Sequence, residues 1–242
     1  MKIRIRQIYY SFFQRFLLDK SFVPYRNFKA NRFLENQIIL KMYLDQDDQG
    51  CGYYGIVSWR FEKKTKKSYD SIQSSITKDF KSSDVYSFFL DQYHERNAYT
   101  NIWQYSVALW HPHLMIEIAQ KIIDRLGYRA DISELKTPII FSNFWIAKPE
   151  IYRRYVREML APAMRLMEED EEISRLCDED SGYGCLFEKE DYCREVNRQF
   201  AISKVRCMEL FGKPYYTYHP FICERLISTW LALNPEVTVS FI

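Results

Sequence analysis

The sequence from position 53 to 61 reads Tyr53-Tyr54-Gly55-Ile56-Val57-Ser58-Trp59-Arg60-Phe61. β-branched and aromatic residues favour strands, and two consecutive apolar residues, Ile56 and Val57, are typical of a strand covered on both faces. We therefore predict a buried strand, with Ser58 and Arg60 where it emerges from the core. Ligands of open α/β sheets bind at this carboxyl edge, so the end of the strand is a candidate site. The alternative is an ordinary core strand whose Arg60 reaches solvent.

The rest of the chain alternates strand-like and helix-like segments. By their apolar periodicity and turn residues, we expect strands at 2–10, 83–89 and 137–147, and helices at 31–44, 71–80, 112–126, 150–167, 192–211 and 220–233. Residues 19–27 are expected to form a loop because they contain Pro24 and Asn27, and the charged residues 62–67 are expected to form another. No linker or repeat divides the chain, so we predict one domain spanning residues 1–242.

The composition is that of a folded globular protein. Apolar residues make up 47% of the 242 residues and charged residues 27%, which argues against disorder. The net charge of +2 argues against a nucleic-acid binder. No run approaches the roughly 20 apolar residues of a membrane span, and charges interrupt the N-terminal segment where a signal peptide needs an apolar core. We expect a cytoplasmic protein.

The first segment is both basic and aromatic. Residues 9–16 contain tyrosines and phenylalanines, and lysines and arginines flank them. Such a segment either contacts the inner face of a membrane or forms an ordinary packed face. The sequence leaves both readings open.

No metal motif is present in the sequence. The six cysteines include no CxxC pair, and the four histidines lack a metal-ligand spacing, so we expect reduced thiols and no zinc. The nearest Asp-x-Asp spacings, Asp45-Gln46-Asp47 and Asp178-Glu179-Asp180, lie in acidic loops. A metal-diphosphate site is therefore not indicated by motif.

Several short sequence words, taken in order, resemble a known family. These are Gln7-Ile8-Tyr9-Tyr10, Phe22-Val23-Pro24-Tyr25-Arg26-Asn27, Tyr54-Gly55-Ile56-Val57-Ser58-Trp59-Arg60-Phe61 with Lys64-Thr65, Asp84-Val85-Tyr86, Trp103-Gln104, Trp110-His111-Pro112, Ser142-Asn143-Phe144-Trp145-Ile146 and Pro220-Phe221-Ile222-Cys223-Glu224-Arg225-Leu226. Together they resemble uncharacterised bacterial glycosyltransferase-like proteins of capsule, O-antigen and exopolysaccharide gene clusters. The resemblance spans nearly the whole chain.

The resemblance implies an α/β fold of the glycosyltransferase A type. This is a Rossmann-like domain with a mixed, mostly parallel central sheet flanked by helices, which binds a nucleotide sugar at the carboxyl ends of its strands. Most such enzymes hold Mn²⁺ or Mg²⁺ with an Asp-x-Asp motif. The matching strand here offers only Asp84 as a metal ligand, so cations such as Arg60 or Lys64 would have to neutralise the diphosphate.

The matching words also supply candidate site residues. Three side chains could accept a proton in catalysis: Glu224, Asp84 and His111. The candidates for donor binding are Gln7, Tyr9, Asn27, Ser58, Trp59, Arg60, Lys64 and Tyr86, and those for acceptor or sugar binding are Trp103, Gln104, Asn143 and Arg225. We expect a cleft lined by Arg60, Asp84 and Glu224.

Each candidate has a structural alternative. Glu224 could only stabilise the first turns of its helix, and His111 could be a cap or a core histidine with a backbone partner. Asn143 could satisfy buried backbone groups, and tryptophans at helix or strand spacing are more often core than sugar platforms.

The expected function is transfer of a sugar from a nucleotide-diphosphate donor to a surface polysaccharide or its lipid-linked precursor. The implied partners are therefore the nucleotide sugar and a glycan or lipid-linked acceptor. The alternative is a non-catalytic carbohydrate-binding or scaffold protein of the same pathway.

Overall fold

The computed structural model describes residues 2–27, 29–79, 82–88, 99–183 and 204–242. In these ranges the chain forms an α/β fold around a six-stranded sheet with strand order β2-β1-β3-β5-β4-β6. β1 runs parallel to β2 and β3, β5 runs antiparallel to both of its neighbours, and β4 runs parallel to β6. The sheet is therefore mixed and mostly parallel, as expected.

The strands are β1 (Ile3–Tyr9), β2 (Val23–Arg26), β3 (Tyr53–Ser58), β4 (Val85–Ser87), β5 (Trp145–Ala147) and β6 (Val239–Phe241). The helices of the N-terminal half are α1 (Phe12–Arg15), α2 (Glu35–Leu44), α3 (Phe61–Thr65), α4 (Tyr69–Lys78), α5 (Ile102–Leu109) and α6 (Leu114–Arg125). Those of the C-terminal half are α7 (Pro149–Tyr155), the π-helical segment η2 (Val156–Leu160), α8 (Ala161–Glu169), α9 (Glu171–Cys177), α11 (Lys204–Phe211) and α12 (His219–Leu233).

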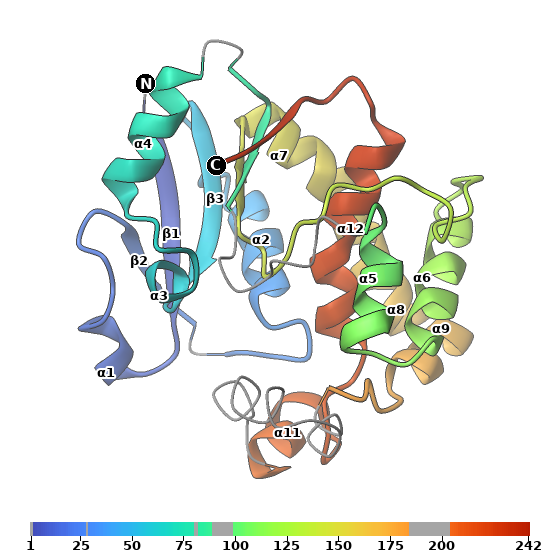
Figure 1. Cartoon of the computed structure of the whole chain (residues 1–242). Coiled ribbons are helices and arrows are strands. Elements are labelled where there is room, and N and C mark those ends of the chain that lie inside the picture. The colour runs from blue at the N-terminus through green and yellow to red at the C-terminus, as the bar shows by residue number, and fades with distance from the viewer. Residues whose placement is uncertain (1, 28, 80–81, 89–98, 184–203) are drawn as a thin grey trace.

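Helices cover both faces of the sheet. Figure 1 shows β1 and β3 between α4 on one side and α2, α7 and α12 on the other. α12 is the central helix of the larger layer, since it contacts α2, α5, α8 and η2. Twelve of its fifteen residues are buried, which explains why its apolar pattern lacks a clear polar face.

The predicted organising strand is β3, and it lies inside the sheet. Its first five residues, from Tyr53 to Val57, are buried, and Ser58 at its carboxyl end is partly exposed. The expectation of a strand covered on both faces is confirmed.

Three local expectations were wrong. Residues 23–26 form the edge strand β2 rather than a loop, because an edge strand tolerates Pro24. Residues 62–65 belong to α3, although their charges suggested a loop. The strand expected at 137–147 is reduced to Trp145–Ala147, since Ser142 and Asn143 adopt left-handed backbone conformations that end the extended run.

The last expected helix of the middle region, 192–211, is described only in its final part, where α11 spans Lys204–Phe211. Within the described residues, none of the helices has the length and apolar content needed to cross a bilayer.

Candidate functional site at the carboxyl edge of the sheet

Four candidate residues from the sequence lie next to one another along one edge of the sheet, at the ends of four strands. Tyr9 pairs with Arg26, so Asn27 follows directly beside it, and its N–H donates to the Tyr9 carbonyl (2.8 Å). Ser58 pairs with Ile8 of the neighbouring strand. Asn143 precedes β5, which runs in the opposite direction, and therefore reaches the same edge. The carboxyl edge of β2, β1 and β3 thus carries Asn27, Tyr9 and Ser58, with Asn143 next to them.

Ser58 carries an unusual hydroxyl. Its Oγ is buried and makes no hydrogen bond to any of the described residues. A buried polar group without a partner costs about 1–3 kcal/mol, so this hydroxyl is a ready contact for a bound molecule.

The turn before β5 connects the sheet edge to α12. Ser142 and Asn143 have φ values of +57° and +54°, and the N–H of Phe144 donates to the Phe141 carbonyl (3.0 Å). This tight turn directs the Ser142 N–H at Glu224, whose Oε1 accepts it at 2.6 Å. Glu224 is therefore fixed at the carboxyl edge, in the second turn of α12.

Lys64 is a cation whose pKa responds to this carboxylate. It lies on α3, and its Nζ is 5.5 Å from the centre of the Phe144 ring. Burial lowers the pKa of Lys64, while the charges of Glu224 and Glu35 raise it and Arg60 lowers it further. Charged side chains from α2, the turn before α3 and α12 therefore all act on Lys64 at this edge.

Arg60 is held by its neighbour in sequence. Its guanidinium lies 4.5 Å from the centre of the Trp59 ring, a cation–π geometry. Both residues follow β3 directly, so the strand end determines where this cation lies.

Sequence reasoning missed a second carboxylate at the edge. Tyr10, which follows β1, donates its hydroxyl proton to Glu35 at the start of α2 (2.7 Å). Burial, followed by the charge of Glu35, raises the pKa of Tyr10 well above its usual value. The signal that could have found Tyr10 was its position directly after a parallel strand. No motif marks Glu35.

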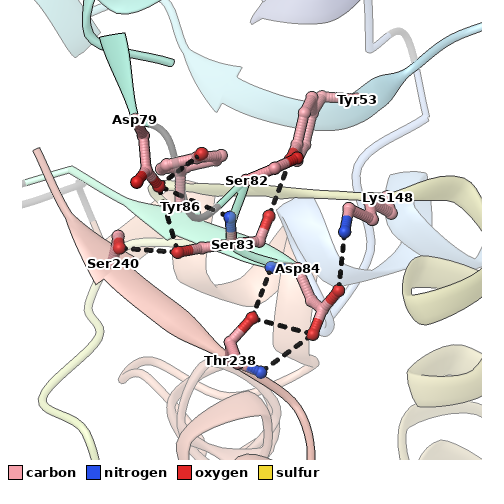
Figure 2. A network of polar contacts seen from close by, with 9 residues as sticks. All are labelled: Tyr53, Asp79, Ser82, Ser83, Asp84, Tyr86, Lys148, Thr238 and Ser240. Carbon is pink, nitrogen blue, oxygen red and sulfur yellow. Dashed lines mark hydrogen bonds and ion pairs between the residues drawn. The ribbon is translucent and has the colours of Figure 1, made fainter. Parts of the chain in front are cut away.

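Asp84 does not lie at this edge. It precedes β4, so it sits at the amino end of that strand, and its carboxylate accepts from Lys148 Nζ (2.9 Å) and from the N–H and hydroxyl of Thr238 (Figure 2). Burial raises the pKa of Asp84, but the Thr238 and Lys148 hydrogen bonds outweigh it and lower the pKa overall. The expected cleft lined by Arg60, Asp84 and Glu224 is therefore not formed. Asp84 instead attaches β6 to β4.

Tyr86 belongs to the same structural network. Its hydroxyl donates to Asp79 (2.7 Å), whose carboxylate also accepts from Ser83, as Figure 2 shows. Tyr86 is fully buried within β4. Gln7 is likewise buried, and its amide oxygen accepts the Asp19 N–H (3.0 Å). Neither side chain faces the edge as an open donor-binding group.

The expected acceptor-binding residues of α5 lie elsewhere. The Trp103 indole is fully buried and donates to Thr229 on α12 (2.9 Å). Gln104 donates to the Ser133 carbonyl (2.8 Å). Arg225 is buried between α12 and α5, where it donates to Ser106 and to the Phe221 carbonyl (2.7 Å). The Trp103–Thr229 and Arg225–Ser106 contacts hold α5 against α12.

His111 packs in the core beside α12. Its Nδ1 donates to the Ser181 carbonyl (2.9 Å), and its ring lies 4.5 Å from that of Phe221. Burial, followed by the charge of Arg225, lowers the pKa of His111 to about 3. A histidine with so low a pKa is a poor general base at neutral pH, and these contacts fit a core role.

The buried histidines make stability sensitive to acid. Burial also lowers the pKa of His219 to about 3. Between about pH 6.5 and pH 3 the unfolded chain binds these protons and the native chain does not, so native stability is complete above pH 6.5 and declines as the pH falls. Urea unfolding at pH 7.5 and 5.5 should therefore differ by about 1.4 kcal/mol for each histidine.

The variant His111→Gln should lose less unfolding free energy between pH 7.5 and pH 5.5 than the wild type, because one of the two buried histidines is gone. His113→Gln, at an exposed position, should lose as much as the wild type. Equal stability of the wild type at the two pH values would contradict this assignment.

The described residues do not fit the divalent metal that the resemblance implies. Asp84, the one candidate ligand, has its oxygens engaged by Lys148 and Thr238 at the other edge of the sheet. Across the described ranges, no three His, Cys, Asp or Glu side chains form a group that could hold a metal ion.

A separate groove of about 580 Å³ lies between α2 and α8. Its lining carries charges of both signs, from Arg157 and Arg165 and from Glu168 and Glu169. It shares no residue with the charged cluster at the carboxyl edge, which consists of Glu35, Arg60, Lys64 and Glu224. Nothing in this lining selects a ligand.

The fold and the charged cluster identify the molecule as an α/β protein with a charged site at the carboxyl edge of its sheet. Comparison with protein-family models, with curated proteins and with solved structures gave no match.

Proposed function

We propose that the protein is a glycosyltransferase of the A type that transfers a sugar from a nucleotide-diphosphate donor to a surface polysaccharide or its lipid-linked precursor. The observation that carries the proposal is the cluster of Lys64, Arg60 and Glu224 at the carboxyl edge, where ligands of open α/β sheets bind. The sequence resemblance supports it independently.

In this proposal the two cations receive the donor diphosphate. Lys64 and Arg60 stabilise the negative charge that develops on the leaving group, a role that many glycosyltransferases assign to a metal. Ser58 ends β3, the strand that leads into Arg60, and Asn27 follows β2 at the same edge, on the other side of β1. A sugar or nucleobase has polar groups that match both.

Glu224 is the base in this proposal. Sugar transfer requires removal of a proton from the acceptor hydroxyl, and a carboxylate fixed near the donor can accept it. The hydrogen bond from the Ser142 N–H keeps the carboxylate at the edge.

The alternative is a non-catalytic carbohydrate-binding or scaffold protein. The Ser142 contact favours it, because a carboxylate that holds the turn before β5 has a structural task without any chemistry. Donor binding without turnover, or no binding of any nucleotide sugar, would favour this alternative.

A thermal-shift screen tests the donor site. We expect one of UDP-, GDP-, CMP- or dTDP-sugars, measured with and without manganese, to raise the melting temperature, because a ligand that binds only the folded state stabilises it. Lys64→Gln should weaken that ligand about 10- to 100-fold, since a hydrogen bond to a charged group contributes about 1.5–3 kcal/mol.

The matched control is Lys63→Gln, which removes an equal charge from the exposed neighbouring position of α3. It should leave the affinity within about twofold, because an exposed charge away from the ligand contributes little. Equal weakening by both variants would show a non-specific charge effect and contradict the proposed role of Lys64.

A further inference from the structure

A patch of exposed aromatic and aliphatic side chains lies on α1 and just beyond it. Phe12, Phe13, Phe16 and Leu17 are 61%, 80%, 71% and 62% exposed, and we call them the α1 patch. Phe12 joins the other two rings, with ring centres 6.3 Å from Phe13 and 5.1 Å from Phe16. The patch is therefore continuous, as functional apolar surfaces are.

The patch is held in place by caps rather than by packing. None of the α1 residues is buried. Ser11 and Gln14 form a capping box, and the Gln14 side chain also accepts the Tyr10 N–H (2.7 Å), which attaches the helix to the end of β1. The fold thus presents four large apolar side chains to the outside on α1 and the turn that follows it.

Exposed cations lie close to the patch along the chain. Arg15 lies within α1 and Lys20 follows it, while Arg26 ends β2 beside Tyr9, and Lys29 comes shortly after. Arg15 reaches the Tyr9 hydroxyl (3.5 Å), so Arg15 and Arg26 both lie next to that strand end. The acidic neighbour, Asp19, is turned inward and accepts the N–H groups of Ser21 and Tyr69.

Large exposed apolar side chains with exposed cations nearby match an anionic lipid surface. Aromatic side chains enter the headgroup boundary, and each nearby Lys or Arg adds about 1 kcal/mol of attraction to anionic lipid. A second copy of the chain fits less well, because two equally basic rims would repel. Pro24 in the adjacent edge strand also limits pairing with a strand from another chain.

We propose that the α1 patch and its basic rim dock onto an anionic bilayer. Figure 1 shows α1 at the same end of the molecule as the arrowhead of β3, so docking brings the carboxyl edge to the lipid surface. The proposal does not depend on the sugar-transfer function, because the binding of vesicles is measured without any nucleotide sugar.

Co-sedimentation with vesicles tests this inference. The full chain should bind vesicles of phosphatidylcholine and phosphatidylglycerol, and bind vesicles of phosphatidylcholine alone much less. Phe13→Ser combined with Phe16→Ser should reduce the partition coefficient at least about tenfold, since each ring loses favourable apolar transfer. Arg15→Gln combined with Lys20→Gln should reduce it about fivefold for each charge removed.

Leu44→Ser is the matched control, because Leu44 is 67% exposed on a different surface, at the end of α2. It should bind vesicles as the wild type does. All four positions changed in the α1 region are exposed, so their variants should retain the wild-type melting temperature, which is checked in the same preparation.

Three results would overturn the proposal. The first is no binding of the wild type to the anionic vesicles, and the second is equal binding by the double phenylalanine variant. The third is a dimer in analytical ultracentrifugation that the same variant converts to monomer, since the α1 patch would then contact a second copy.

Discussion

Replacing Glu224 with glutamine is expected to lower turnover of the nucleotide sugar about 10²- to 10⁴-fold while leaving its binding intact. The glutamine amide oxygen can still accept the Ser142 N–H, so the turn before β5 should keep its shape. The variant lacks the carboxylate that removes the proton from the acceptor hydroxyl. Release of the nucleoside diphosphate, measured on the donor identified by thermal shift, reports the rate, and the shift itself reports binding.

Asp84→Asn is the informative comparison for Glu224→Gln. Asp84 is the other carboxylate of the matching sequence words, but it lies at the amino end of β4 and binds Lys148 and Thr238. Its variant should lower stability and keep the wild-type rate per folded molecule. Loss of turnover in Asp84→Asn with normal turnover in Glu224→Gln would reverse the assignment. Donor binding without turnover in the wild type would favour the non-catalytic reading.

Replacing Gly55 with alanine is expected to be the most destabilising single change discussed for this fold. A Cβ at this position would lie 2.5 Å from the Trp145 carbonyl oxygen and 2.8 Å from Ile146 Cγ2. The first of these is backbone of the paired strand β5, which cannot move without disturbing the sheet. We expect a loss of about 3 kcal/mol in the free energy of unfolding, the upper part of the range for overpacked cores.

Gly50→Ala is the control for the Gly55 variant. Gly50 has φ of +69° and open space around its Cβ position, so alanine there should cost only about 1 kcal/mol of backbone strain. Urea unfolding of the two variants distinguishes steric overlap from strain. Similar losses in both would contradict the close approach of β3 and β5.

The central strand could be predicted because its signal is local. Tyr53 to Val57 form a run of aromatic and β-branched residues with consecutive apolar side chains, and such a run has few alternatives to a buried strand. The same applies to α12, whose apolar spacing begins after a proline. Edge elements gave weaker signals. β2 contains Pro24, and β6 has only three residues, whose pairing with β4 depends on contacts across more than 150 positions.

The candidate site could be predicted only in part, because strand direction matters as much as strand identity. Ser58 and Asn27 follow their strands and so reach the carboxyl edge. Asp84 precedes its strand, and that order alone predicts the opposite edge. Arg225 and Glu224 are neighbours in sequence, yet helical geometry directs one to α5 and the other to the sheet. Glu35 reaches the site by tertiary packing, which no local pattern encodes.

Amide hydrogen exchange of the wild type, with and without the nucleotide sugar that gives the largest thermal shift, tests the central claim most directly. The account predicts slower exchange at residues 58–65 and 142–144, which carry Arg60, Lys64 and the turn bound to Glu224. Residues 82–85 and 237–239, at the opposite edge around Asp84, should exchange unchanged. Protection confined to that opposite edge, or no shift with any of the nucleotide sugars, would contradict a donor site at the carboxyl edge of the sheet.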